Sequence, residues 1–204
     1  LEVHDGDGVV RKPNVQGALL LKMPLPPGCL PTLWNDDEGF ERAYLRAHPG
    51  YYTTGDGGYV DAEGYVYVMG RIDDVINVAG HRLSTGELEQ AIAGHAAVAE
   101  CAVIGATDQL KGQVPVGFLC LTKGVNRPHP EIVKECVTLM REQIGPVADF
   151  KRAVVVDRLP KTRSGKILRA TMVKIADSES FKMPATIDDP VILDEIREAL
   201  QTIG

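Results

Sequence analysis

The sequence predicts an α+β fold, in which a small domain with a mixed sheet flanked by helices follows a mainly β fragment. Two observations indicate this class. Residues 1–69 carry little helical periodicity, whereas helical and strand patterns alternate from Ser84 to the end of the chain. A short charged link, residues 71–74, joins the two parts. We therefore expect three segments, which cover residues 1–70, 71–74 and 75–204.

The first segment is expected to consist of strands and loops. An apolar run over residues 17–23 ends at a stretch rich in proline and glycine, which predicts a strand and a loop. A short helix is expected over residues 38–48. Two apolar runs, 58–60 and 65–69, flank a turn in which Gly64 can adopt a positive φ, and this pattern predicts a hairpin. The segment holds too few apolar residues for a large core of its own.

A junction follows over residues 70–89. Residues 75–78 form a brief apolar strand, and residues 80–82 are predicted to turn the chain. Ser84-x-x-Glu87 has the pattern of a capping box, which opens a helix.

Beyond the junction, helix and strand signals alternate. The helix over residues 130–144 is the clearest, because Ile132, Cys136 and Met140 share one face, and Gly145-Pro146 ends it. The other expected elements are strands over 101–104, 114–121 and 153–156 and helices over 168–176 and from Asp189-Pro190 to Leu200.

The composition is that of an ordinary globular protein. Of 204 residues, 44% are hydrophobic and 25% are charged, and the formal net charge is −6. An acidic balance argues against general nucleic-acid binding. No apolar run approaches the ~20 residues that span a bilayer. The chain begins with Leu1 rather than Met, so we expect the true N-terminus to be missing.

The cysteines and histidines predict no metal site. The cysteines form no C-x-x-C pair, and each lies in or near an apolar stretch, so we expect reduced core thiols. The five histidines show no ligand spacing. The cysteines are Cys29, Cys101, Cys120 and Cys136.

Basic residues concentrate in one segment. Residues 151–174 hold eight lysines and arginines against the single acid Asp157. A basic segment in an acidic protein suggests a compact polyanionic ligand, such as a nucleotide or coenzyme A. A solvated charged face explains the same segment equally well.

Two stretches could carry chemistry. In residues 51–58, Asp56 lies between glycines, where one carboxylate can accept two hydroxyl hydrogen bonds from a ribose diol. On this octet alone, an ordinary turn aspartate is the better interpretation. In residues 159–167, Gly165-Lys166 suggests a phosphate loop, but Pro160 stands where a Walker sequence needs glycine. A lone loop lysine is usually only solvated.

Together these motifs resemble a known family. Residues 70–89, the Tyr-x-Thr-Gly-Asp pattern that ends at Asp56, and the Pro-Lys-Thr-x-Ser-Gly-Lys pattern that ends at Lys166 are similar to motifs of the acyl-adenylate-forming enzymes. Residues 77–82 look in particular like the acetyl- and propionyl-CoA synthetase branch. The resemblance implies the C-terminal part of an AMP-forming short-chain acyl-CoA synthetase, without the family's upstream phosphate loop and acyl pocket.

The resemblance implies a two-step reaction. A carboxylate and ATP give acyl-adenylate and pyrophosphate, and coenzyme A then displaces AMP to give a thioester. Mg²⁺ would accompany ATP, held by phosphates and upstream residues. Residues 186–190 look like propionyl-CoA synthetases, so propionate is the first choice of substrate and acetate the second. The implied partners are these small molecules, the missing N-terminal part of the polypeptide, and a lysine acetyltransferase or deacetylase acting on Lys166. We expect a cytoplasmic protein, or a mitochondrial-matrix protein in a eukaryote.

The resemblance also assigns roles to single residues. Lys166 matches the catalytic lysine that enters the active site during adenylation, where an ammonium stabilises developing negative charge. Asp73 matches the hinge about which the C-terminal domain swings between the two steps. The implied ligands of the nucleotide are Asp56, Arg71 and Arg82, and those of coenzyme A are Gly80 and Arg141.

The main rival is a non-enzymatic module that binds coenzyme A or a carrier protein through the basic segment. A native start near Leu1 would favour this module, and a chain several hundred residues longer would favour the enzyme. A carrier-loading adenylating enzyme is another alternative, which residues 77–82 disfavour. The chain by itself is expected to be inactive.

Overall fold

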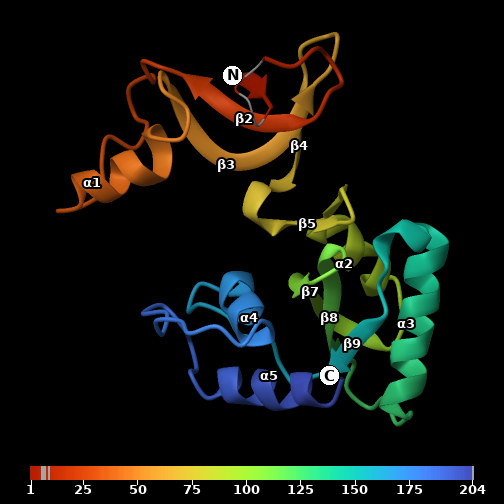
Figure 1. The fold of residues 1–204 in the computed structure, drawn as a ribbon. Helices are drawn as coiled ribbons and strands as arrows, with labels where there is room; N and C mark the ends of the chain where they lie inside the picture. Colours follow the sequence, from red (N-terminus) through yellow and green to blue (C-terminus); the bar gives the residue numbers. More distant parts are fainter. Residues whose placement is uncertain (6–7, 9, 204) are drawn as a thin grey trace. The chain divides into compact units, whose positions relative to one another are not determined.

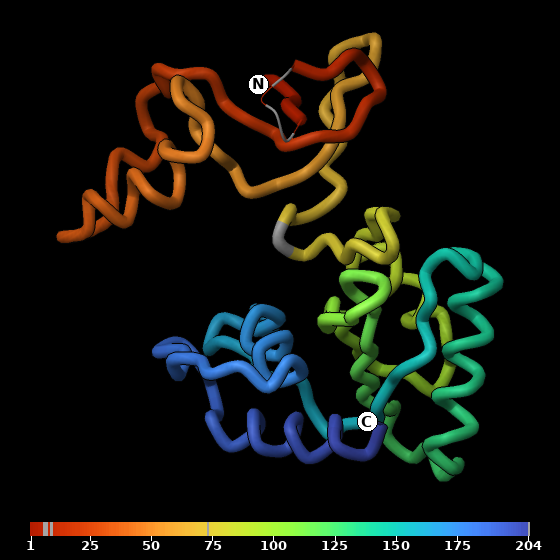
Figure 2. The backbone as a smooth tube through the Cα atoms, in the orientation of Figure 1, coloured from red at the N-terminus to blue at the C-terminus, as the bar shows by residue number. Residues whose placement is uncertain are grey.

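The computed structural model describes every residue except 6–7, 9 and 204, and it leaves the side chain of Asp73 undescribed (Figures 1 and 2). The chain divides into two compact units, Leu1–Asp73 and Asp74–Gly204, each built around its own β-sheet. The division falls inside the expected hinge segment, within the 3-10 turn η2 (Ile72–Asp74). None of the helices in the described part of the chain is long and apolar enough to cross a membrane.

The first unit is mainly β. Its elements are β1 (Glu2–His4), β2 (Gly17–Lys22), α1 (Asp37–Phe40), the π-helical η1 (Glu41–Leu45), β3 (Tyr51–Val60) and β4 (Val66–Arg71). The four strands form an antiparallel sheet in chain order. The predicted hairpin is confirmed, since β3 pairs with β4 and Gly64 between them has a φ of 91°. The helix expected over residues 38–48 is the short α1 continued by η1.

Few side chains of the first unit are buried, as its low apolar content predicted. β4 is exposed along its whole length, and its Tyr67 ring stacks on Tyr59 of β3 with ring centroids 4.7 Å apart. Among the described residues of this unit, the buried hydrophobic side chains are Val3, Leu19, Leu20 and Phe40.

The second unit is a five-stranded mixed sheet with helices on both faces (Figure 1). Its strands are β5 (Val75–Val78), β6 (His81–Ser84), β7 (Val98–Asp108), β8 (Gly112–Leu121) and β9 (Arg152–Val155). Its helices are α2 (Thr85–Ala93), α3 (His129–Gln143), the short η3 (Pro146–Ala148), α4 (Arg169–Ala176) and α5 (Ile192–Gln201). β8 is central, because it pairs antiparallel with β5 and β7 and parallel with β9. The α+β class is confirmed.

The sheet of the second unit is buried on both faces, because successive residues of a strand point to opposite sides. Val103 of β7 and Leu119 of β8 pack in one cluster with α2 and α3. Ile104 and Phe118, one residue along each strand, pack in a second cluster with α4 and α5. A strand buried in this way has a continuous apolar sequence, which is why residues 114–121 could be predicted.

One of the four expected core thiols is on the surface. Cys29 is exposed, whereas Cys101, Cys120 and Cys136 are buried. Burial raises the pKa of the Cys101 thiol to about 12. The buried thiols therefore stay protonated and behave as small apolar side chains.

Two helix starts differ from the predicted ones. α5 begins at Ile192 rather than Pro190. The Val191 N–H donates to Asp189 Oδ1 at 3.0 Å, so the aspartate closes a turn of its own before the helix. At the start of α2, Ser84 occupies the N-cap position but its side chain makes no capping hydrogen bond. The predicted capping box is therefore not formed.

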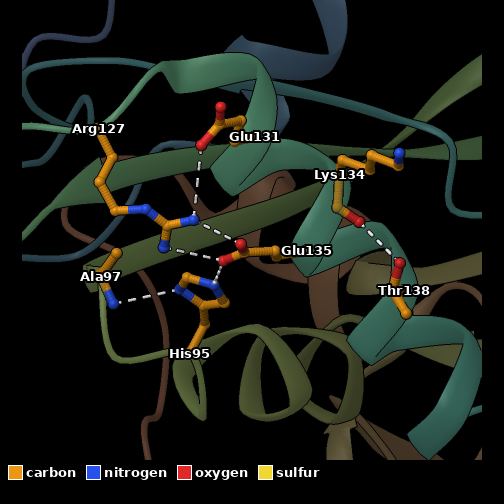
Figure 3. A network of polar contacts seen from close by, with 7 residues as sticks. All are labelled: His95, Ala97, Arg127, Glu131, Lys134, Glu135 and Thr138. Carbon is orange, nitrogen blue, oxygen red and sulfur yellow. Dashed lines mark hydrogen bonds and ion pairs between the residues drawn. The ribbon is translucent and has the colours of Figure 1, made fainter.

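A polar network joins the end of α2 to α3 (Figure 3). The Arg127 guanidinium donates to both oxygens of Glu135, at 3.0 and 2.5 Å. His95 Nε2 lies 2.8 Å from Glu135 Oε2, and the Ala97 N–H donates to His95 Nδ1 at 3.2 Å. Because Nδ1 accepts, the ring proton is on Nε2 and is donated to the carboxylate. Hydrogen bonds from Arg127 and His95 lower the pKa of Glu135 from 4.5 to about 2.

This network should make the stability of the domain sensitive to acid. A carboxyl whose pKa is lowered on folding stabilises the fold above its unfolded pKa, and this contribution is lost as the pH falls through the folded value of about 2. Glu135→Gln should lower the free energy of unfolding at neutral pH, and the difference from wild type should shrink as the pH approaches 2. Urea denaturation across this range measures it. Glu131→Gln is the control, because Glu131 lies 3.8 Å from Arg127 and should matter less. A Glu135→Gln difference that does not change with pH would contradict the assignment.

Candidate functional site

The predicted catalytic lysine lies in a closed turn, the Lys166 loop (residues 161–167). The two ends of the loop form an antiparallel bridge. Inside it, the Thr162 N–H donates to the Lys166 carbonyl at 2.8 Å, and the Lys166 N–H donates to Thr162 Oγ1 at 3.0 Å. Gly165 has a φ of 85°, a left-handed conformation that glycine adopts without steric cost. Threonine and glycine of the predicted motif thus shape the loop.

The segment after α4 supports this loop from outside. Thr162 bridges to Ile187, and the N–H groups of Arg163 and Asp188 donate to carbonyl groups of the opposite segment at 3.0 and 2.9 Å. Ile187 is buried in the cluster between the sheet and α4 and α5. Residues 186–188 therefore fix the loop to the apolar core of the domain.

The Lys166 side chain is exposed, and no ion pair to it is found among the described residues. Neighbouring cations of the basic segment are engaged by acids. Lys161 Nζ lies 2.5 Å from Glu100, and Arg158 lies 2.7 Å from a carboxylate oxygen of Asp189. The basic segment is therefore not one open cationic surface. Lys166, like Arg163 and Lys174, is exposed, so its ammonium is accessible to a ligand.

A largely buried ion pair holds the start of α4, which follows the Lys166 loop. The Arg169 guanidinium donates to both oxygens of Glu89 on α2, at 2.8 to 3.1 Å. The two side chains are 22% and 17% exposed. Glu89 Oε1 also accepts from the Val103 N–H of β7 at 2.9 Å. This pair ties the loop and α4 to the helix and strand on the other side of the domain.

Breaking this pair should destabilise the domain. Arg169→Met leaves the Glu89 carboxylate with one backbone donor in a poorly hydrated place, which should cost roughly 2–4 kcal/mol of unfolding free energy. Arg163→Met is the matched control, since Arg163 is exposed and should change stability by less than about 0.5 kcal/mol. Urea denaturation of both variants makes the comparison. Equal, small losses would show that the pair does not anchor α4.

The turn between β5 and β6 carries Gly80 and Arg82. The predicted turn over residues 80–82 is wrong in its position, because Ala79 and Gly80 make the turn, with φ of 49° and 89°, and Arg82 lies in strand β6. Arg82 is paired in register with Asn77, and both are exposed. A Cβ on Gly80 would meet no atom within 4 Å. Within its own unit, Gly80 is therefore required by backbone conformation and not by crowding.

The predicted coenzyme A residue Arg141 is exposed in the last turn of α3, well separated in sequence from Gly80. A chain of contacts links the two regions. The Ala79 N–H donates to the Lys111 carbonyl at 2.8 Å, and Lys111 Nζ lies 2.5 Å from Asp149, which follows η3 beyond the end of α3.

In the first unit, the structure brings together two of the three predicted nucleotide ligands. Asp56 of β3 and Arg71 of β4 are cross-strand partners, with Arg71 Nη1 3.6 Å from Asp56 Oδ1. Arg71 Nη1 also donates to the Thr54 carbonyl at 3.0 Å. Gly55 has a φ of 79°, and a Cβ there would lie 2.5 Å from the guanidinium. Asp56 is thus a strand residue and not a turn aspartate, and the glycine before it makes room for Arg71.

Sequence reasoning gave no role to Glu89, Lys111 or Asp149. Each forms its contact with a residue far along the chain; the Glu89–Arg169 pair is 80 residues apart. The one local signal for Glu89 was that a charged residue follows Leu88, which is fully buried on α2.

The described residues offer no metal site. Among them, no group of three or more histidine, cysteine, aspartate or glutamate side chains lies together as a metal ion would need.

Comparison with known proteins defines the class. Residues 87–166 match the family described as the AMP-binding enzyme C-terminal domain. Those residues run from α2 to the end of the Lys166 motif, so they include both the Glu89 anchor and the lysine. This part of the second unit is thus similar to the C-terminal domain of AMP-binding enzymes.

Particular relatives narrow the comparison to short-chain acyl-CoA synthetases. An uncharacterized protein of Pseudomonas aeruginosa is 57% identical over 98% of this chain and 32% of its own length. The mitochondrial acyl-CoA synthetase short-chain family member 3 of Mus musculus is 49% identical over 91% of the chain and 27% of its own length. Acetyl-coenzyme A synthetase of Pyrobaculum arsenaticum is 40% identical and is covered over 30% of its length. The resemblance predicted from the motifs is confirmed, and the chain spans about a third of these relatives or less.

Solved structures agree. The o-succinylbenzoate CoA synthetase of Bacillus subtilis, in complex with its acyl-adenylate intermediate, has a TM-score of 0.68 at 31% identity. The match covers 83% of this chain and 32% of that one. The anthranilate CoA ligase structure with anthranoyl-AMP has a TM-score of 0.73 at 28% identity, over 87% and 33% of the two chains.

Proposed function

We propose that this chain is the C-terminal part of an ATP-dependent, AMP-forming short-chain acyl-CoA synthetase. In the first step a carboxylate oxygen attacks the α-phosphorus of ATP and pyrophosphate leaves, which gives the acyl-adenylate. In the second step the coenzyme A thiol loses its proton and attacks the acyl carbon, and AMP leaves. The observation that carries the proposal is the exposed Lys166 ammonium on a braced loop, in a chain similar to acyl-CoA synthetases along its length.

Lys166 is the catalytic residue of the first step. The carboxylate and the α-phosphate are both negative, and more charge develops on oxygen as pyrophosphate leaves. A positioned ammonium lowers the energy of that transition state more than that of the bound substrates. The hydrogen bonds inside the Lys166 loop hold the Lys166 backbone in place. The long lysine side chain can therefore extend to a substrate while its Cα stays fixed.

The other predicted residues bind the two cosubstrates. Asp56 accepts hydrogen bonds from the ribose hydroxyls of the adenylate, and Arg71, 3.6 Å from it, orients that carboxylate. Arg82 faces the nucleotide phosphates. Gly80 leaves space beside the pantetheine arm, and Arg141 pairs with phosphates of coenzyme A. Mg²⁺ bound with ATP would neutralise phosphate charge, and the residues that would hold it are expected upstream of this chain.

Asp73 is the pivot between the two steps. Residues 1–70 form the last piece of the large N-terminal domain, residues 71–74 the hinge, and residues 75–204 the mobile domain. A compact-unit boundary at Asp73 is consistent with this role. Swinging the domain exchanges the Lys166 loop for the Gly80 turn at one active site. The remainder of the polypeptide is thus the essential partner, and the chain alone is inactive. The compartment is the cytoplasm, or the mitochondrial matrix in a eukaryote.

The acyl group should be propionyl first and acetyl second, as the similarity of residues 186–190 favours. The full-length protein, assayed with acetate, propionate and butyrate, should form AMP only when carboxylate, ATP and coenzyme A are all present. The rate with propionate should be the highest. If the rates with the three acids follow a different order, only the proposed acyl specificity is wrong. No AMP with any of them would contradict the proposed activity.

The rival is a non-enzymatic module that binds coenzyme A or a carrier protein through its basic segment. The ion pairs of Lys161, Arg158 and Arg169 weigh against it, because they occupy cations that such a module would use. A carrier-loading adenylating enzyme would share the first step and differ in the second. Thioester formation on free coenzyme A, against formation on a carrier protein, separates the two.

Lys166→Ala should harm the first step alone. In the full-length enzyme, carboxylate-dependent pyrophosphate exchange should fall by about 10²–10³, the usual loss for one preorganised electrostatic group. Thioester formation from supplied acyl-adenylate should stay close to wild type, because the rotated domain carries the loop away. Acetylation of Lys166 removes the same charge and should inhibit the same step.

Lys174→Ala is the control for that measurement, since Lys174 is an exposed lysine of the same basic segment on α4. It should leave both half-reactions unchanged. Wild-type pyrophosphate exchange by Lys166→Ala would refute the catalytic assignment.

A further inference from the structure

A pocket lies in the C-terminal unit, and the Lys166 loop takes no part in it. Its volume is about 430 Å³, and it opens between the sheet and the helices α4 and α5. Its apolar walls include Val116, Ile175, Phe181 and Leu200. The volume is in the range of pockets that hold small organic molecules, roughly 300–1,000 Å³. No residue of the Lys166 loop lines it.

One guanidinium in this pocket lacks a partner. Arg152 begins β9, in register with Val116 of β8, and its side chain lies on the α4 and α5 face of the sheet together with the buried Val154. Its Nε is fully buried and has no hydrogen-bond partner. No ion pair to Arg152 is found in the described part of the chain. A buried charged donor without an acceptor is costly, so the site favours a ligand that supplies one.

The charges around Arg152 select the ligand. Arg197 also lines the pocket, but the Asp194 carboxylate engages it. Glu179 lines the pocket as well and adds one negative charge there. The Glu179 carboxylate would repel phosphate, which is a dianion, more strongly than it would repel a monoanion. The apolar walls leave room for a hydrocarbon tail.

We propose that this pocket binds a small monocarboxylate with an apolar tail. The Nε–H and one Nη–H of Arg152 donate side by side to the two carboxylate oxygens, and the tail lies against Val116, Ile175 and Phe181. The site is separate from the proposed catalytic residues. Its occupancy therefore does not depend on whether the chain belongs to an acyl-CoA synthetase.

Hexanoate is the probe, and the Arg152 side chain itself supplies the readout. In the ¹⁵N-labelled full-length protein, the Arg152 Nε–H resonance is assigned by its loss in Arg152→Lys. Hexanoate should shift this resonance saturably. Hexanamide, which has the same tail without the charge, should bind at least about tenfold more weakly. Inorganic phosphate should also bind more weakly than hexanoate.

Variants test the contact a second time. Arg152→Met, which keeps the apolar stem, should weaken hexanoate binding by about tenfold to a hundredfold. Arg46→Met, an exposed arginine of the first unit, should have no effect. Glu179→Gln should bind hexanoate as tightly as wild type or more tightly, because a neighbouring negative charge is removed.

Several results would overturn the proposal. If hexanoate does not shift the Arg152 resonance of the wild-type protein, the proposal is overturned whatever the variants show. Equal binding of hexanoate and hexanamide, or unchanged binding by Arg152→Met, would remove the guanidinium from the site. Binding by Glu179→Gln alone would mean that Glu179 itself occupies Arg152 in solution.

Discussion

The C-terminal unit depends on one ion pair, Glu89 with Arg169. Two charges that are about four-fifths buried are stable only when their hydrogen bonds are met, and the Val103 N–H completes the set. This requirement fixes α4 against α2 and β7, three elements that are distant in sequence. The Lys166 loop ends just before α4 and therefore inherits a defined position. A backbone held in place reduces the entropy that a loop side chain loses when it is positioned against a substrate.

Burial on both faces constrains the sheet of this unit in the same way. β8 has partners on both sides and is buried on both faces, so its side chains must alternate between the two apolar clusters. One face packs α2 and α3, and the other packs α4, α5 and Ile187. The Gly80 turn, Arg82 of β6 and the Lys166 loop, which we propose contribute to the active site, all lie outside this central strand.

Local patterns predicted the local elements, and long-range chemistry escaped them. Gly64 indicates its hairpin because glycine adopts the positive φ of the turn without steric cost. Asp189 shows the limit of such signals, because an aspartate closes a turn as readily as it caps a helix. The Glu89–Arg169 pair could not be predicted, since the residues adjacent to each in sequence carry no information about a partner 80 residues away. Asp56 and Arg71 were assigned by resemblance, and the strand register supplies the physical reason that they meet.

The bridge between Thr162 and Ile187 has a consequence for how such domains can be recombined. Residues 186–188 are outside the matched family segment, which ends at residue 166, yet they brace its last loop. A chimera that joins two relatives between α4 and this bracing segment would separate surfaces that have been shaped to fit each other. A crossover placed ahead of β9 would keep the loop, α4 and residues 186–188 from a single parent, and the Glu89–Arg169 pair would then join the two parents.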